Sequence, residues 1–172
     1  MQILPNFMEK DKIIKEESLH KNMKKGGAVV LNSIWKSLGN LNMNSFSDRL
    51  ILQKKVFLLQ EMGLNLGYDF KKYIYGPYSS ELAKDSFTID IKNNSEEESL
   101  KSFFDKLKEL SSGHENEPRW FELLATITYL KNKMDKNKIE IKKLIEEEKP
   151  YLSDDLLFNE AYSRLIKLKV IL

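Results

Sequence analysis

Apolar residues recur at intervals of three and four along most of this chain, which places them on one face of an α-helix. The pattern is strongest in 45–63, where Ser47 or Asp48 is the expected N-cap and Gly63 the expected stop. Further helices are expected at 28–38, 79–83, 95–110, 118–134, 139–147 and 154–168. The pattern therefore predicts a mainly α-helical protein.

Two lysines interrupt the apolar surface of the helix expected in 45–63. Apolar side chains cover more than half of its circumference, so this helix is expected in the middle of the core. Lys54 and Lys55 form its only strongly polar strip. Because lysine is rarely buried, we expect this strip to face solvent or a ligand.

The periodicity changes after this helix. Residues 68–75 are rich in tyrosine, phenylalanine and isoleucine, which predicts one strand or two short strands joined near Lys71 and Lys72. Alternating apolar residues in 86–94 favour a small edge strand. The expected fold class is thus mainly α with a small β-hairpin or short sheet.

A Gly-Pro pair follows the aromatic segment. Gly76, Pro77 and Tyr78 are expected to form a turn, and Ser79 or Ser80 to cap the short helix after it. Such a fixed turn would aim the tyrosines beside it rigidly. Two interpretations stay open, a binding tip and a corner that defines the fold.

The last three helices have the order of a helix-turn-helix domain, with Pro150 and Ser153 marking a turn and Ser153 or Asp154 capping the final helix. That helix would be the recognition element. However, Asp154 and Asp155 at its start repel phosphates, and a plain helical bundle has the same order of elements. The apolar tail 170–172 is compatible with a terminal strand.

Composition excludes several classes of protein. The 172 residues are 41% hydrophobic and 31% charged, as in an ordinary globular protein, and no apolar run approaches the ~18 residues of a membrane span. The start of the chain lacks the apolar core of a signal peptide. Cysteine is absent, which excludes disulfides and thiolate metal sites, so the cytosol is the simplest expected location.

Charge is divided along the chain although the net charge is only +2. Residues 1–60 hold ten basic and five acidic residues, residues 61–130 eight and thirteen, and residues 131–172 ten and eight. The basic residues are twenty-five lysines and three arginines. Because bidentate base readout usually employs arginine, any nucleic-acid binding should be directed at the backbone. A solvated, lysine-rich surface accounts for the same composition.

Residues that could carry chemistry are few. The only histidines, His20 and His114, lie in separate polar stretches, so no transition-metal site is expected. Ser111 and Ser112 lie near His114, but in a loop without an obvious third group. We therefore expect no enzyme, no cofactor and no metal.

Four tyrosines within 68–78 are interleaved with lysines. Aromatic rings beside lysines can stack on bases and neutralise phosphates. They can equally form a half-buried hairpin whose tyrosines and lysines keep only their polar ends in water. The candidate binding residues of this segment are Lys71, Lys72, Tyr73, Tyr75 and Tyr78.

Two motifs resemble a known family. The helix motif L-Q-K-x-x-F-L at 52–58 is followed by an aromatic segment and by Y-G-P-Y-S-x-E-L at 75–82. This order resembles the front of the Panacea-type antitoxins and the SocA-like adaptors, a group with uncharacterised prokaryotic relatives. Two later stretches, WFELLATITYL and EEEKPYLSDDLLFNEAYSRLIKLKVI, are similar to the back half of those relatives. The resemblance covers about 49–172.

The resemblance implies a winged-helix-like helical domain without catalytic residues. Such proteins are linked to toxin neutralisation, to delivery of a partner for proteolysis, or to transcriptional control. Our hypothesis is a regulatory or antitoxin-like protein that binds a protein partner, with a nucleic-acid-binding transcriptional regulator as the alternative. The candidate contacts are Lys24, Lys25, Lys54, Lys55, Lys71, Lys72, Tyr73, Tyr75 and Tyr78, and the structural turn consists of Gly76, Pro77 and Ser79.

The first residues have no counterpart in that family, so we divide the chain into a helical extension, 1–45, and a winged-helix-like domain, 46–172. The helix at 28–38 has more apolar surface than one core-facing stripe needs. One face can pack on the core through Ile34 and Leu38, and the other is a candidate partner surface. The alternative is that the helix is fully buried. The lysines beside it are Lys21, Lys24, Lys25 and Lys36.

Overall fold

A computed structural model describes residues 31–32, 34, 36–37, 41–87 and 100–172. These residues are mainly α-helical with one small antiparallel hairpin, which confirms the expected fold class. The elements are α2 (Phe46–Glu61), β1 (Lys71–Tyr73), β2 (Gly76–Tyr78), α3 (Ser80–Asp85), α4 (Lys101–Ser111), α5 (Pro118–Asn132), α6 (Lys138–Glu148), the 3₁₀ helix η2 (Pro150–Leu152) and α7 (Asp155–Lys167).

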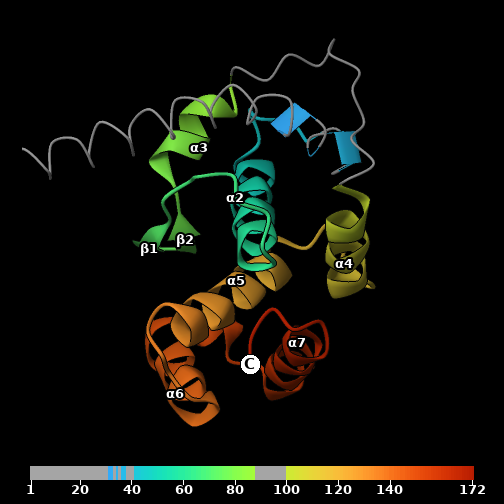
Figure 1. Cartoon of the computed structure of the whole chain (residues 1–172). Helices are drawn as coiled ribbons and strands as arrows, with labels where there is room; N and C mark the ends of the chain where they lie inside the picture. Colours follow the sequence, from blue (N-terminus) through green and yellow to red (C-terminus); the bar gives the residue numbers. More distant parts are fainter. Residues whose placement is uncertain (1–30, 33, 35, 38–40, 88–99) are drawn as a thin grey trace, which may run out of the picture.

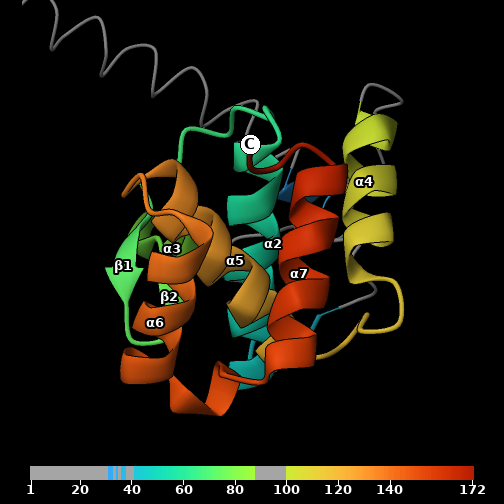
Figure 2. The ribbon, with the colours of Figure 1, turned by 90° about the horizontal axis from the view of Figure 1, so that it is seen from below.

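Helix α2 lies in the middle of the molecule (Figure 1), with the hairpin and α3 on one side and α4 on the other. Its most extensive partner is α5, which α6 and α7 flank in the view of Figure 2. Residues 51–59 of α2 are all buried, and so is most of α5 between Trp120 and Leu130. The expected central position of this helix is therefore confirmed.

Helix α2 begins earlier than predicted. Its N-cap is Ser45, not Ser47 or Asp48, and the Ser45 hydroxyl accepts the backbone N–H of Asp48 at 3.3 Å. The Asp48 carboxylate instead accepts the N–H of Asn42 at 2.7 Å. The aspartate therefore holds the turn that precedes the helix.

The hairpin differs from the prediction in the position of its turn. Lys71 pairs with Tyr78 and Tyr73 with Gly76, so Ile74 and Tyr75 form a two-residue turn. The predicted turn at 76–78 is in fact the second strand, and the predicted joint at 71–72 lies within the first. Pro77 pairs with Lys72, between the two other pairs. In an antiparallel ladder every second pair exchanges no backbone hydrogen bonds, so a proline, which has no N–H, is tolerated at this position.

The C-terminal half follows the predicted pattern closely. Pro118 lies in the first turn of α5, Asn137 forms a capping box with Glu140 at the start of α6, and Asp154 caps α7. On α7 the buried residues are Phe158, Ala161 and Leu165, while Leu157 is only partly buried. The tail forms no strand; Val170 and Ile171 are instead buried in the core.

Only part of the N-terminal extension is described. Residues 31–32, 34 and 36–37 are helical, and Leu31 and Ile34 belong to the buried core. The expected packing of this helix through Ile34 is confirmed. Several expected features lie outside the described residues. They are Leu38, Lys24, Lys25 and residues 88–94 of the edge strand expected at 86–94.

Candidate functional site

Two adjacent residues of α2 hold the second strand of the hairpin. The Gln53 amide donates to the Ser79 carbonyl and accepts the Ser79 N–H, both at 2.9 Å. The Lys54 ammonium donates to the Pro77 carbonyl at 2.6 Å. Ser79 also caps α3, as predicted, by accepting the Leu82 N–H. The two motifs that carry the family resemblance are therefore in direct contact.

The turn of the hairpin is held by the far end of α6. The Lys149 ammonium donates to the Ile74 carbonyl and forms an ion pair with Glu122 of α5, with Nζ 2.7 Å from Oε1. The Tyr151 hydroxyl donates to the same carboxylate oxygen at 2.6 Å. Lys149 and Glu122 are both about 95% buried, so this pair is shielded from water.

Burial changes the acid–base behaviour of these groups. The pKa of Lys54 falls from 10.5 to about 7, because desolvation outweighs the attraction of the Glu122 carboxylate and the Lys149 charge lowers it further. Burial also lowers the pKa of Lys55. The pKa of the Tyr151 phenol is raised, first by desolvation and then by its hydrogen bond to Glu122.

Of the two surroundings expected for Lys54 and Lys55, solvent or a ligand, solvent is wrong. Lys54 is only 2% exposed, and Lys55 is buried with its ammonium 4.7 Å from the centre of the Phe121 ring. The hairpin and α5 cover the strip on which both lysines lie. A charged side chain is normally excluded from a protein core. Here the Pro77 carbonyl replaces water as the partner of Lys54, and the face of the Phe121 ring does so for Lys55.

The tip of the hairpin presents apolar side chains to solvent. Tyr73 is 60% exposed and Ile74 68%, and Tyr75 is 42% exposed. The Tyr73 and Tyr78 rings are 5.4 Å apart between centroids, and Phe46, from the start of α2, meets Tyr75 edge to face at the same distance. We call Phe46, Tyr73, Ile74, Tyr75 and Tyr78 the hairpin surface.

A cavity of about 240 Å³ opens beside the hairpin surface, between α2, the hairpin and α3. Its walls include Phe46, Tyr73, Tyr75 and Tyr78, and Lys54 contributes to its lining. Four of the predicted site residues, Lys54, Tyr73, Tyr75 and Tyr78, are thus brought together around one cavity.

The two lysines on β1 are exposed but paired. The Lys72 ammonium is 2.7 Å from the carboxylate of Glu148, and that of Lys71 is 3.9 Å from Asp69. Lys71 and Lys72, both predicted site residues, therefore lie near the tyrosines, and each lysine has an acidic neighbour. Exposed pairs of this kind are weak and leave the lysines accessible.

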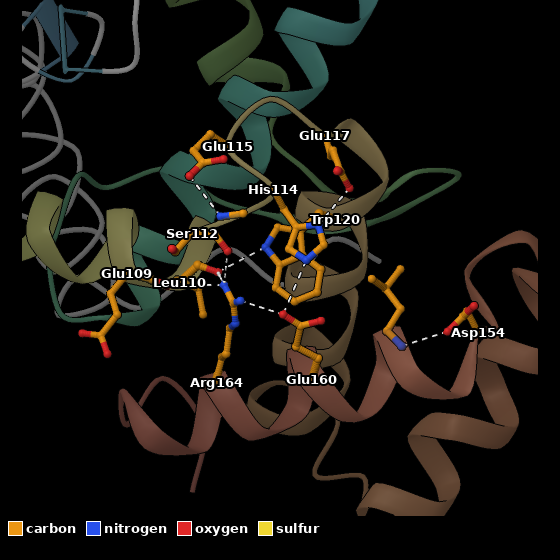
Figure 3. A network of polar contacts seen from close by, with 12 residues as sticks. Glu109, Leu110, Ser112, His114, Glu115, Glu117, Trp120, Asp154, Glu160 and Arg164 are labelled. Atoms are coloured by element: carbon orange, nitrogen blue, oxygen red, sulfur yellow. Dashed lines mark hydrogen bonds and ion pairs between the residues drawn. The ribbon is translucent and has the colours of Figure 1, made fainter.

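A second polar network lies between α4, α5 and α7 (Figure 3). The His114 ring stacks on Trp120 with centroids 4.1 Å apart, and its two nitrogens lie 3.0 Å from Glu117 and 3.5 Å from Glu160. The Ser111 hydroxyl instead donates to a backbone carbonyl of its own helix. The serines near His114 therefore form no nucleophile–base pair with it.

Arg164 completes this network. Its guanidinium donates to the carbonyl of Ser112 at 2.7 Å and to that of Leu110 at 3.2 Å, at the end of α4. It also forms an ion pair with Glu160 at 2.6 Å. Because these contacts satisfy the carbonyls at a helix end, the network holds α4 against α7.

Four residues of this region are not predicted from the sequence: Phe46, Glu122, Lys149 and Tyr151. The signal for Glu122 was present, since it is the single acidic residue within the apolar run WFELLATITYL. A lone carboxylate in a buried helix needs a cationic partner. Nothing in the sequence indicated that this partner was Lys149.

No group of acidic or histidine side chains that could hold a metal ion occurs among the described residues. Within the same residues, no helix is both long and apolar enough to cross a bilayer.

We predict that the protein becomes more stable as pH rises from 7 toward 10. Lys54 has a pKa of about 7 in the folded chain and 10.5 when unperturbed, so the unfolded state binds the additional proton in this window. Stability then increases with pH, by at most about 1.4 kcal/mol per unit. Urea unfolding at pH 7 and pH 9 measures the slope. It should be smaller in Lys54→Met, and an unchanged slope would contradict the prediction.

Comparison of the chain with protein-family models, with curated proteins and with solved structures finds no match. The resemblance to the antitoxin and adaptor group accordingly stays a prediction.

Proposed function

We propose that this chain is a non-catalytic binding protein that recognises a protein partner through the hairpin surface. The observation that carries the proposal is a group of exposed tyrosines on a hairpin whose backbone is held by buried lysines. Toxin neutralisation or delivery of a partner for proteolysis, which the resemblance implies, are activities of this kind.

The anchors give the hairpin surface a fixed shape. The carbonyl of Ile74, in the turn, and that of Pro77, on the second strand, each accept a hydrogen bond from a buried ammonium. A rigid loop loses less conformational entropy when it binds than a mobile one. Tyrosine contributes large contact area with only two side-chain torsions to fix. These features support high-affinity contacts made by a few residues.

The charges around the hairpin surface favour a protein over a nucleic acid. Lys54 and Lys55 are buried, while Lys71 and Lys72 lie beside Asp69 and Glu148. Nucleic-acid affinity depends on lysines and arginines that replace counterions at phosphates. Fewer such groups are available here than the sequence suggested, whereas the exposed tyrosines are equally suited to a protein interface.

We predict that Tyr73→Ser combined with Tyr78→Ser reduces partner recovery at least tenfold. A tenfold loss corresponds to about 1.4 kcal/mol, which is modest for removing two aromatic contacts. The full-length tagged chain is expressed in its native host, and captured proteins are quantified with and without nuclease, at low and moderate salt. Tyr73 and Tyr78 are 60% and 37% exposed, so both replacements should leave folding intact.

Leu156→Ser is the matched control. Leu156 is 85% exposed and lies on α7, a helix that Figure 2 shows on the other side of α5 from the hairpin. Its replacement should leave capture unchanged. Equal losses in the control and the double variant would contradict a specific surface. A partner released by nuclease would instead favour the nucleic-acid alternative.

A further inference from the structure

One buried charge beside the hairpin surface lacks an acidic partner. Among the described residues, no carboxylate lies within 4 Å of the Lys54 ammonium, whose one hydrogen bond goes to the Pro77 carbonyl. Glu122, the carboxylate that acts on it electrostatically, is already bound to Lys149 and Tyr151. The region beneath the hairpin therefore holds two lysines and one acid.

This ammonium lies beside the cavity next to the hairpin surface. Gly76 also lines that cavity, and a Cβ added to Gly76 would lie 3.7 Å from Nζ of Lys54. Arg49 lines the same cavity, and no acidic side chain is among its described lining residues. Apart from Gln53 and Ser86, the remaining walls are aromatic and aliphatic, so the cavity combines a mainly apolar space with two cationic side chains.

The size of the cavity limits what it can hold. An apolar cavity of about 150 Å³ is large enough for benzene, and this one has about 240 Å³. A single large side chain with a carboxylate attached fits that volume. The exposed tyrosines and Phe46 around the opening extend well beyond it, and only a larger molecule would cover them.

We propose that the cavity binds a carboxylate next to a large apolar side chain, presented by a peptide segment of the protein partner, with Lys54 and Arg49 as the cationic contacts. This inference rests on the proposed function, because the peptide would lie across the hairpin surface. The carboxylate would supply the anionic neighbour that the Lys54 ammonium lacks.

Such binding must depend on pH. A carboxylate binds the charged ammonium, and the pKa of about 7 for Lys54 means that roughly nine-tenths of the ammonium is charged at pH 6 and one-tenth at pH 8. Apparent affinity for a carboxylate should therefore be about tenfold weaker at pH 8 than at pH 6. A neutral ligand of the same shape should show no such change.

The test uses N-acetylphenylalanine, which has a free carboxylate, and N-acetylphenylalaninamide, which has the same side chain without the charge. Each is titrated into the ¹⁵N-labelled full chain at pH 6 and pH 8 while the Gly76 amide signal is followed. The acid should bind at least fivefold more tightly than the amide at pH 6, and this preference should be much smaller at pH 8, where Arg49 alone stays charged. In Lys54→Met the preference at pH 6 should fall to this lower level and should no longer depend on pH.

Lys55→Met is the matched control, because Lys55 is the neighbouring buried lysine and does not line this cavity. It should keep the preference. Equal affinity for acid and amide at pH 6 in the unmodified chain would overturn the carboxylate site, whether or not Lys54→Met folds. Capture of a partner through Tyr73 and Tyr78 would then still stand. If the chain bound the acid but captured no protein through its hairpin surface, the proposal that a partner's peptide supplies the carboxylate would be wrong.

Discussion

Replacing Glu122 by glutamine should lower the free energy of unfolding by about 3–5 kcal/mol, because it removes the carboxylate that neutralises the buried Lys149. The Tyr151 hydroxyl would lose a charged acceptor in the same step. Glutamine keeps the size of the side chain, so the loss reports charge and not a cavity. Urea unfolding followed by circular dichroism measures it.

Glu148→Gln is the control for this experiment. Glu148 pairs with Lys72 at the same 2.7 Å, but both side chains are over 40% exposed. Because exposed ion pairs contribute little, its loss should stay below about 1 kcal/mol. Replacing Glu122 by leucine and Lys149 by methionine together should recover much of the lost stability, since no charge then remains unpaired. A small effect of Glu122→Gln would mean that water reaches the pair.

Gly76→Ala should destabilise the protein by about 2–5 kcal/mol. Gly76 has a φ of +83°, where a side chain adds about 1–2 kcal/mol of strain. Its Cβ would also lie 2.9 Å from Oγ1 of Thr126, which is buried in α5 and cannot move aside freely. Overpacking of this kind typically adds about 1–3 kcal/mol. Thermal and urea unfolding both measure the change.

Gly113→Ala separates the two contributions. Gly113 has the same φ of +83°, but a Cβ there meets nothing within 4 Å, so only the backbone strain should appear. Thr126→Ala offers a second check, because the Thr126 hydroxyl oxygen is buried without a hydrogen-bond partner and its removal breaks no such bond. Combined with Gly76→Ala, it should restore about 1–2 kcal/mol. If both glycine variants lost the same free energy of unfolding, the Thr126 side chain must move aside without cost.

The elements that sequence predicted well are those decided by neighbouring residues. The start of α5 at Pro118 and the Asp154 cap of α7 each depend on a few adjacent positions. The hairpin turn was misplaced because Gly76 and Pro77 are typical of turns, and only the pairing with β1 shows that they form a strand.

The candidate site could be predicted only in part. The tyrosines were identified because they cluster within one segment, and the structure does group Tyr73, Tyr75 and Tyr78 around a cavity. The lysines of α2 were misinterpreted because helical periodicity describes which residues share a face, but not what covers that face. Burial of Lys54 depends on the carbonyl of Pro77, 23 residues later on the hairpin. The role of this surface in binding stays a prediction.

The anchor between Lys149 and the Ile74 carbonyl joins positions 75 residues apart in sequence. A chain that is still being synthesised therefore has its tyrosines outside the ribosome long before the lysine that fixes the turn. Contacts at such separation form late in folding, after their loop has closed. The nascent hairpin thus lacks its final shape until η2 and the end of α6 have packed. A partner that requires that shape would bind the fully folded protein and not the nascent chain.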